Sequence, residues 1–459
     1  MVFSSLMFLF RFLPVSLFLY YISPKKLKNF TLFAVSIVFY SWGEMRYFPI
    51  IVLLICINYF SGLALGHFKD NRKMQKIVLA FSVIGSLSML LVFKYTNFFI
   101  ANANAIFSLT IDPIKLTLPL GISFYTFQSM SYTIDVFRGD VAVEPSFIDF
   151  GAYVVMFPQL IAGPIVKYRD VAAELKILDR VNLPAIEEGI ALFIFGLGKK
   201  VLIANNIGAL WDEIVSVGFH NISTPLAWFG ILAYALQIYF DFSGYSLMGI
   251  GMGKMLGFEF PDNFDLPYIS RSITEFWRRW HMTLGSWFRE YVYIPMGGNR
   301  LGLKRQILNL FFVWFLTGFW HGANWNFILW GLYYFALITL EKIWLSDVLK
   351  KNRVLSHLYT LLAVLIGWVL FAIVDLNAIG VFLSKMFVPQ TGVSVLYYLR
   401  NYGISVLVGC IMSTRLPIWF YEKIKKNNFV LIPVLSFILV AVIAYLVDST
   451  YNPFIYFIF

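Results

Sequence analysis

The stretch that most constrains the fold covers residues 306–340, which are apolar or aromatic almost throughout. A membrane-spanning helix rises about 1.5 Å per residue and needs roughly 20 residues to cross the hydrocarbon core. The stretch is therefore too long for one simple span, and we expect it to break or to double back. Gly318 and Gly322 flank His321 at the point where a break is easiest.

His321 is the only side chain in this stretch that titrates near neutral pH. An ionisable residue at membrane depth is costly, which makes it a functional hypothesis by default. A neutral imidazole can accept a proton from a hydroxyl group, and burial keeps the ring uncharged. The structural alternative is a neutral histidine that shares its proton with a neighbouring backbone carbonyl.

The composition indicates an all-α polytopic membrane protein. Of the 459 residues, 59% are hydrophobic and only 13% are charged, and the mean hydropathy is +0.75. The apolar runs lack the alternation of a β-barrel. Lysine and arginine outnumber the acids by 36 to 25, which in a membrane protein indicates cytoplasmic loops facing anionic lipid, not nucleic-acid binding. We predict one integral-membrane domain over residues 1–459, with about ten spans.

The order of apolar runs and basic clusters predicts the orientation of the N-terminal half. Basic clusters at 25–28 and 69–76 follow the first and third runs, which places these loops in the cytoplasm and the N-terminus outside. The first run, 1–22, lacks a cleavage site and is predicted to be a retained helix. We expect 102–114 to form an outer loop, and the ending YNPFIYFIF to lie at the outer interface.

Two features interrupt the apolar pattern in the middle of the chain. Pro158, Gly163 and Pro164 make a full span doubtful there and favour a re-entrant segment. Asp241 lies within an otherwise apolar run. A buried acid of this kind serves either structural hydrogen bonding or the chemistry of a site, and the sequence leaves both interpretations open.

A second histidine, His281, lies in a segment over 264–305 that is too charged to span a bilayer. At helical spacing the aromatic residues and one leucine share a face with the histidine: Trp277, Trp280, His281, Leu284, Trp287, Phe288 and Tyr291. This pattern predicts an aromatic-faced helix at the cytoplasmic interface, with arginines toward water and phosphate. The alternatives are that His281 simply packs in the aromatic face and that the arginines anchor the helix.

Several kinds of catalytic site are missing from the sequence. The two cysteines, Cys56 and Cys410, have no metal-ligand or disulfide spacing, and no H-E-x-x-H motif is present. No G-x-S-x-G turn supplies a nucleophile. What remains is base-assisted transfer at a buried imidazole, and the basic, aromatic segment suits a donor that carries phosphate and a ring. We therefore expect no metal.

Two motifs carry a resemblance to a known family. WRRWHMTLGSWFREYVYIPMGGNR, followed by TGFWHGANWNFILWG, resembles the membrane-bound O-acyltransferases (MBOAT), and most closely the bacterial membrane subunits that O-acetylate alginate and peptidoglycan. LPLGISFYTFQSMSYTIDVFRGD and YFDFSGYSLMGIGMGKMLGF are similar to the same branch. The resemblance runs nearly from end to end.

The resemblance implies a function and a fold. His321 occupies the position of the catalytic histidine, and His281 that of the second histidine. The fold would be an MBOAT-like ring of helices around a central funnel, in the bacterial inner (cytoplasmic) membrane. The donor substrate would be acetyl-CoA, with no other cofactor. The acetyl group would pass across the membrane to a separate extracytoplasmic SGNH-type transferase, which completes its transfer to a polysaccharide.

The candidate substrate-binding residues are, for CoA phosphates, Arg278, Arg279 and Arg289, and, near the histidines, Trp280, Trp320, Asn324, Trp325 and Asp241. Three alternatives remain at this stage. One is a D-alanyl transferase of teichoic acid, which takes its acyl group from a carrier protein. Another is a solute or polymer transporter with His321 in a proton relay at a broken helix. The third is a scaffold for polysaccharide export that has no turnover.

Overall fold

The computed structural model describes residues 2–161 and 163–448, and the regular elements within these ranges are all helical. A single isolated bridge, between Ile222 and Val393, is the only β-type pairing there. The predicted all-α class is therefore confirmed. The chain forms two compact units, Met1–Phe193 with Ser246–Pro261 (unit 1) and Ile194–Tyr245 with Asp262–Phe459 (unit 2).

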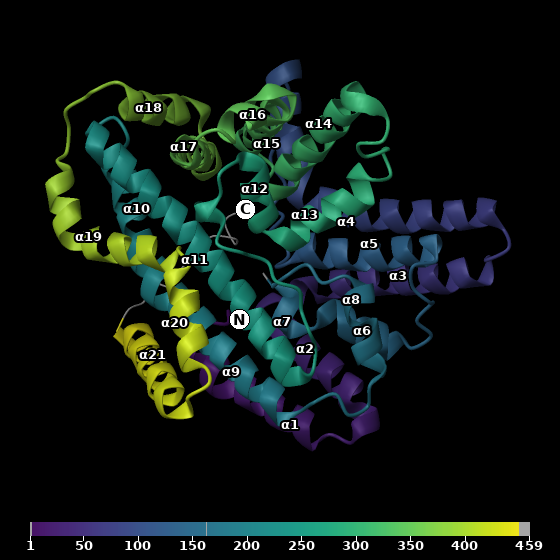
Figure 1. Cartoon of the computed structure of the whole chain (residues 1–459). Coiled ribbons are helices and arrows are strands. Elements are labelled where there is room, and N and C mark those ends of the chain that lie inside the picture. Colours follow the sequence, from purple (N-terminus) through teal and green to yellow (C-terminus); the bar gives the residue numbers. More distant parts are fainter. Residues whose placement is uncertain (1, 162, 449–459) are drawn as a thin grey trace. The chain divides into compact units, whose positions relative to one another are not determined.

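Unit 1 is built from the N-terminal helices (Figure 1). They are α1 (Leu13–Ile22), α2 (Lys28–Glu44), α3 (Phe48–His67), α4 (Arg72–Phe107), α5 (Ile122–Arg138), α6 (Phe147–Val155), α7 (Phe157–Leu160) and α8 (Tyr168–Lys176). Two longer helices, α9 (Leu183–Gly198) and α11 (Thr224–Leu256), begin in one unit and end in the other.

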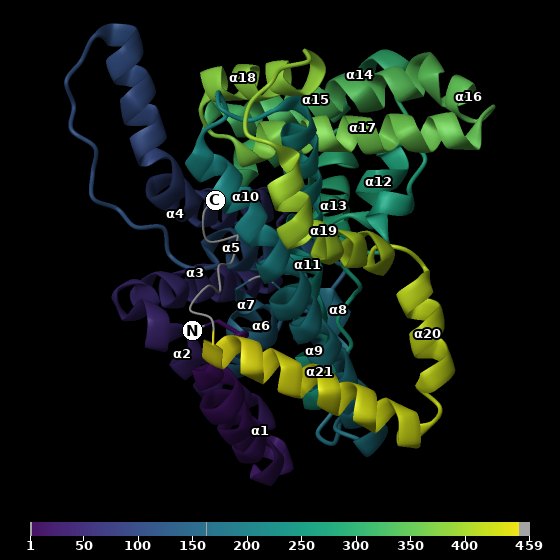
Figure 2. The ribbon, with the colours of Figure 1, turned by 90° about the vertical axis from the view of Figure 1, so that its left-hand side faces the viewer.

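Unit 2 holds the remaining helices, of which α14 to α18 gather together in both Figure 1 and Figure 2. They are α10 (Asn205–Val217), α12 (Ile273–Arg279), α13 (Met282–Phe288), α14 (Gly302–His321), α15 (Trp325–Leu340), α16 (Ser346–Leu349), α17 (Arg353–Ala372), α18 (Leu376–Phe387), α19 (Val395–Met412), α20 (Leu416–Ile424) and α21 (Asn428–Asp448). Short π-helical turns are η1 (Phe8–Phe12), η4 (Lys199–Ala204), η6 (Arg289–Tyr293) and η7 (Glu341–Leu345), and 3₁₀ turns are η2 (Lys25–Leu27), η3 (Met45–Tyr47) and η5 (Pro267–Ile269).

Eight helical segments are long and apolar enough to cross a membrane: Lys25–His67, Arg72–Phe107, Leu183–Val217, Thr224–Leu256, Trp325–Leu349, Arg353–Ala372, Val395–Met412 and Asn428–Asp448. Two shorter apolar helices, Phe8–Ile22 and Leu376–Phe387, accompany them. The chain is thus a multi-pass membrane protein. The predicted number of about ten spans and their ring-like order around a funnel stay predictions.

Polar side chains join the helices of unit 1. Asn58 on α3 donates from Nδ2 to Ser86 Oγ on α4 at 3.0 Å. Ser82 on α4 donates to Asn58 Oδ1, also at 3.0 Å, and contacts Thr133 on α5. Small hydroxyl and amide side chains let helices approach closely within a membrane, where water cannot satisfy their polar atoms. This helps explain why α5 is almost entirely buried although hydroxyl and amide side chains recur along it.

Aromatic rings dominate the core of unit 2, which brings together α10, α11, α12, α14, α15, α17 and α18. Its short helix α12 is fixed by a buried acid, Glu341, which directly follows the long apolar stretch 306–340. The Glu341 carboxylate accepts hydrogen bonds from the backbone N–H groups of Ile273 and Thr274 at 2.6 and 2.9 Å. A carboxylate is favourable at a helix N-terminus, so Glu341 ties the start of α12 to the end of α15.

The structure corrects two sequence predictions. The single aromatic-faced helix through Trp280 and His281 is wrong, because two seven-residue helices, α12 and α13, meet at a sharp break at these two residues. The expected loop over 102–114 is also partly wrong, because α4 continues to Phe107. The apolar run around Pro158 is interrupted as predicted, because α6 ends at Val155 and the short helix α7 begins at Phe157. The re-entrant course of this segment stays a prediction. The ending YNPFIYFIF lies outside the described residues.

Candidate active site

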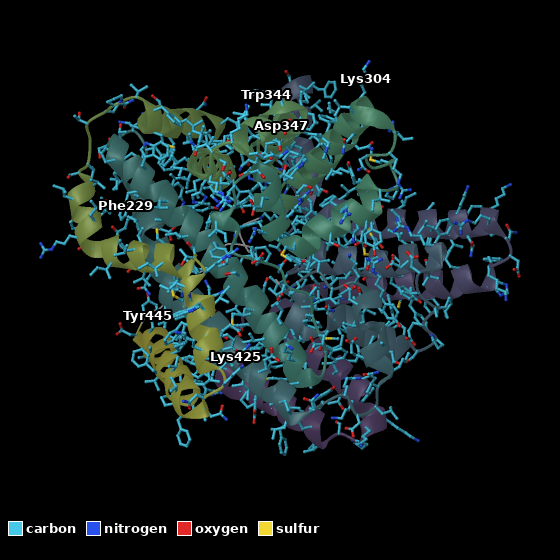
Figure 3. All side chains as sticks on the ribbon, in the orientation of Figure 1. Phe229, Lys304, Trp344, Asp347, Lys425 and Tyr445 are labelled. Carbon is cyan, nitrogen blue, oxygen red and sulfur yellow. The ribbon has the colours of Figure 1, made fainter. Side chains whose placement is uncertain are left out.

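The hairpin of α14 and α15 places His321 at its tip. The two helices pack tightly, since a Cβ added to Gly318 would lie 2.3 Å from the carbonyl oxygen of Phe327. α14 ends at His321, Gly322 is extended with φ −167°, and α15 begins at Trp325. The predicted break in the long apolar stretch is therefore confirmed at Gly322. Figure 3 labels Lys304, which lies near the start of α14, at the end of this helix away from His321.

Gly322 keeps the tip of the hairpin compact. A Cβ added there would lie 2.2 Å from the ring of Phe327, which closes over the turn. Any side chain would push this ring away or unwind the start of α15. The glycine thus permits the close approach that holds His321 at the end of its helix.

Three aromatic rings surround His321, whose residue surface is only 6% exposed. Its ring centroid lies 5.0 Å from Trp320, 4.9 Å from Trp330 and 5.2 Å from Phe371, and each pair is nearly perpendicular. Phe371, at the end of α17, is held by Asn326, whose Nδ2 donates to its backbone carbonyl at 3.3 Å. Packing from three helices therefore orients the imidazole.

His281 lies at the break between α12 and α13 with a left-handed backbone, φ +44°. It is 2% exposed. Its Nδ1 lies 3.0 Å from Asn263 Oδ1, and the same oxygen accepts from Thr283 Oγ1 at 2.9 Å and from the backbone N of Thr283 at 3.3 Å. A further backbone bond runs from Met282 N to Asn263 O at 2.9 Å. The segment at Asn263 thus straps the break in place.

These contacts fix where the proton of His281 resides. A backbone N–H only donates, so the Asn263 atom that faces Thr283 N is the amide oxygen. Nδ1 of His281 must then carry the proton that this oxygen accepts, and Nε2 carries the lone pair. Burial lowers the pKa of His281 to about 3. The ring is therefore neutral at physiological pH, with one defined tautomer.

Both histidines contact the same aromatic side chain, that of Trp320. Trp320 lies next to His321 and also contacts His281, with ring centroids 6.2 Å apart. Phe242 of α11 packs edge-on against His281 at 4.6 Å. The indole of Trp320 thus links the two imidazoles, which the sequence placed forty residues apart. This juxtaposition is the main result of the fold for the site.

The predicted arginines differ in their surroundings. Arg279 forms ion pairs with Asp265 at 2.9 Å and Glu275 at 3.1 Å. Its charge is already matched by two carboxylates. Arg278 and Arg289 are exposed, and of the three they are better placed to meet phosphate.

Four other candidates are either exposed or held by structural partners. Asn324 is exposed at the start of α15, and Trp325 beside it is 51% exposed. Trp280 is buried against Trp368 with ring centroids 4.8 Å apart. Asp241 forms a buried ion pair with Lys200, Nζ to Oδ1, at 2.6 Å, which supports the structural interpretation of this acid.

Three residues of the site were not predicted from the sequence: Asn263, Trp330 and Phe371. Trp330 and Phe371 look like ordinary core residues within apolar runs. Asn263 had one available signal, because it is a polar residue in a short segment shortly before the second histidine motif. Among the described residues, no cluster of three or more His, Cys, Asp or Glu side chains could hold a metal ion.

Comparisons with known proteins show the family of the chain. Residues 6–374 match the family model of the membrane-bound O-acyltransferases. The chain is 42% identical to the probable alginate O-acetylase of Azotobacter vinelandii, over 84% of this chain and 78% of that protein. It is 34% identical to the peptidoglycan O-acetyltransferase of Helicobacter pylori (86% and 81%). It is 28% identical to the teichoic acid D-alanyltransferase of Streptococcus thermophilus (51% and 60%). The chain therefore belongs to the membrane-bound O-acyltransferase family and is an acyltransferase.

Proposed function

We propose that this protein is an O-acetyltransferase of the bacterial cytoplasmic membrane. It takes acetyl groups from cytosolic acetyl-CoA and passes them across the membrane for O-acetylation of a cell-wall or exported polysaccharide. The observation that carries the proposal is the pair of buried histidines joined through Trp320. The similarity to alginate and peptidoglycan O-acetyltransferases supports the acetyl group and the polysaccharide.

Acyl transfer from a thioester requires a base beside the acceptor hydroxyl. A ring nitrogen of His321 takes the proton of the acceptor hydroxyl as its oxygen attacks the thioester carbonyl. The new C–O bond forms, the C–S bond breaks as the tetrahedral intermediate collapses, and the proton passes from the imidazolium to the CoA thiolate. The aromatic rings around His321 exclude water, which limits hydrolysis of the thioester.

His281 would assist this transfer from the donor side. Because Asn263 holds the proton on Nδ1, the Nε2 atom is the one that exchanges a proton. The exposed arginines Arg278 and Arg289 would attract the phosphates of CoA. A separate SGNH-type transferase outside the membrane would accept the acetyl group and complete the transfer to sugar, as the resemblance to the bacterial branch implies.

Acetyl transfer is favoured over D-alanyl transfer from a carrier protein. The match to the teichoic acid D-alanyltransferase covers half of this chain, whereas the match to the alginate O-acetylase covers 84% at higher identity. Membership of an acyltransferase family sets aside the transporter and the scaffold without turnover.

Transfer from radiolabelled acetyl-CoA tests the proposal. Purified protein in nanodiscs is given the labelled donor, and label in a polysaccharide or partner-protein acceptor is measured. His321→Ala should lower the rate by about 10²–10⁴, the usual contribution of a general base. Its melting temperature should stay close to that of the wild type. Transfer of D-alanine from a carrier protein, with none from acetyl-CoA, would contradict the acetyl proposal. An unchanged rate in His321→Ala would contradict the role of His321.

A further inference from the structure

A polar pocket opens beside α18 in unit 2, apart from the two histidines. It has a volume of about 620 Å³. His220 lines it from the loop between α10 and α11. α18 and the following loop contribute the polar Asn377, Ser384, Lys385 and Gln390 beside Leu376, Gly380 and Val381. No sequence motif and no step of the proposed acyl transfer involves this pocket.

The walls of the pocket are tied firmly together. Phe219, next to His220, packs edge-on against Phe382 of α18 with ring centroids 5.0 Å apart. Trp228 donates from Nε1 to a carbonyl in the last turn of α18 at 2.8 Å. Backbone and side-chain hydrogen bonds also join the segments 221–224 and 388–393. A pocket that is formed before its ligand arrives loses less entropy on binding.

The charge in the pocket is a single cation. Lys385 is 7% exposed, and among the described residues no carboxylate lies within ion-pair distance of its Nζ. The pocket lining contains no aspartate or glutamate. Asp375, just before the same helix, caps its N-terminus by accepting a hydrogen bond from the backbone N–H of Ala378. A largely buried cation with no acidic partner favours an anionic ligand.

The volume of the pocket and its other side chains restrict the class of ligand that it can bind. Ligand pockets commonly measure about 300–1,000 Å³, so this one suits a molecule larger than a lone ion. Asn377, Ser384 and Gln390 supply amide and hydroxyl groups that exchange hydrogen bonds with sugar hydroxyls. A single lysine, without an arginine fork, meets one anionic group as a point charge, which matches a sugar that carries one carboxylate. These features describe an acidic sugar.

The pocket lies at the less basic ends of two candidate spans. Its wall contacts the start of α11, at Thr224, whereas the basic Lys254 lies at the other end of that helix. α17 is preceded by Lys350, Lys351 and Arg353 and ends shortly before α18. Because basic ends face the cytoplasm, the pocket faces the opposite side of the membrane. The same end of α17 supplies Phe371, which packs against His321.

We propose that this pocket binds a carboxylate-bearing sugar unit of the polysaccharide acceptor on the extracytoplasmic side, with Lys385 meeting the carboxylate. The inference rests on the proposed function, because it assumes an acidic glycan as acceptor. It adds a binding site that orients the polymer close to the membrane enzyme and its partner transferase.

Equilibrium binding to the full-length protein in nanodiscs tests this site without turnover. The probes are a short oligouronate, a peptidoglycan fragment with free carboxylates, and a neutral oligosaccharide of the same length as the oligouronate. At least one acidic probe should bind, and the one that binds identifies the acceptor class. Lys385→Met should raise its Kd by about ten-fold or more, since charge-assisted hydrogen bonds are the stronger ones. Equal binding of the neutral probe, or an unchanged Kd in Lys385→Met, would overturn the proposal.

Two glycines provide a matched pair for blocking the pocket. Gly380 lines the pocket and Gly403 lies on α19, and a Cβ added to either meets nothing within 4 Å. Gly380→Phe should fill the pocket and abolish binding, whereas Gly403→Phe should bind like the wild type. His321→Ala should also bind normally, so a failure of acetyl transfer is distinguished from a failure of this site. Unchanged binding in Gly380→Phe, with the variant folded, would rule the pocket out.

Discussion

The two histidines of the site are held in different ways. His321 ends a long helix and is oriented by three aromatic rings. His281 lies at a left-handed break between two short helices and is oriented by a hydrogen bond from Nδ1 to Asn263. Aromatic packing fixes the plane of a ring but not the position of its proton, whereas a hydrogen bond fixes both. The hydrogen bond to Asn263 therefore assigns one tautomer to His281 and leaves Nε2 as the nitrogen that can accept a proton.

The largest expected effect in this comparison comes from removing the imidazole of His281. His281→Ala would mix two effects, because alanine is strained at φ +44°. His281→Asn avoids this problem, since asparagine tolerates a left-handed backbone. We expect acetyl transfer to fall by about 10²–10⁴, with little change in melting temperature. A transfer rate within three-fold of the wild type would show that His281 only packs in the site and takes no part in the transfer.

The second prediction concerns α11, whose Phe242 packs against the ring of His281. Asp241 precedes Phe242 and pairs with buried Lys200. Removing one member of a buried pair leaves an unmatched charge, which costs about 3–5 kcal/mol. Asp241→Asn should therefore lower the melting temperature while the remaining folded protein stays active, and Lys200→Met with Asp241→Leu should recover part of the stability. A stable but inactive Asp241→Asn protein would place this acid in the chemistry instead.

The contrast between the histidines also separates what sequence could predict from what it could not. The membrane class, the burial of His321 and the break at Gly322 follow from local features, namely apolar length and a flanking glycine. The break at His281 depends on Asn263, eighteen residues earlier, whose oxygen accepts from His281 and Thr283. Helical periodicity carries no signal of such a tertiary contact, so the pattern predicted one continuous helix. The grouping of both imidazoles around Trp320 likewise depends on packing between distant segments.

Asn263 gives a sharper test of the same contrast through pH. Burial lowers the pKa of His281 to about 3, below about 6.5 for a free imidazole. The folded state prefers the neutral ring, so the contribution of this group to stability is complete above pH 6.5 and is lost as the pH falls toward 3. Asn263→Asp keeps the acceptor but adds a negative charge, which raises the pKa of His281. Asn263→Leu removes the acceptor at similar volume.

We expect Asn263→Leu to lower the rate by about ten-fold at all pH values, because it removes the hydrogen bond that orients the ring and adds no charge. Asn263→Asp should keep more activity near pH 8 and lose it at a higher pH than the wild type as the solution is acidified. The rate of acetyl transfer between pH 5 and 9 measures both. Parallel pH profiles for the two variants would show that Asn263 supports only the fold and does not set the tautomer of His281.

The smallest effect should come from the arginines beside His281. Arg278 is exposed, whereas Arg279 is matched by Asp265 and Glu275. Arg278→Ala should raise the KM for acetyl-CoA by about three- to ten-fold with little change in kcat, the pattern of lost ground-state binding. Arg279→Ala leaves two carboxylates unmatched near the donor, so its KM should rise through repulsion of phosphate, and added salt should reduce that rise. An unchanged KM in Arg278→Ala, measured at low salt, would mean that this arginine anchors the segment to lipid and that donor recognition lies elsewhere around His281.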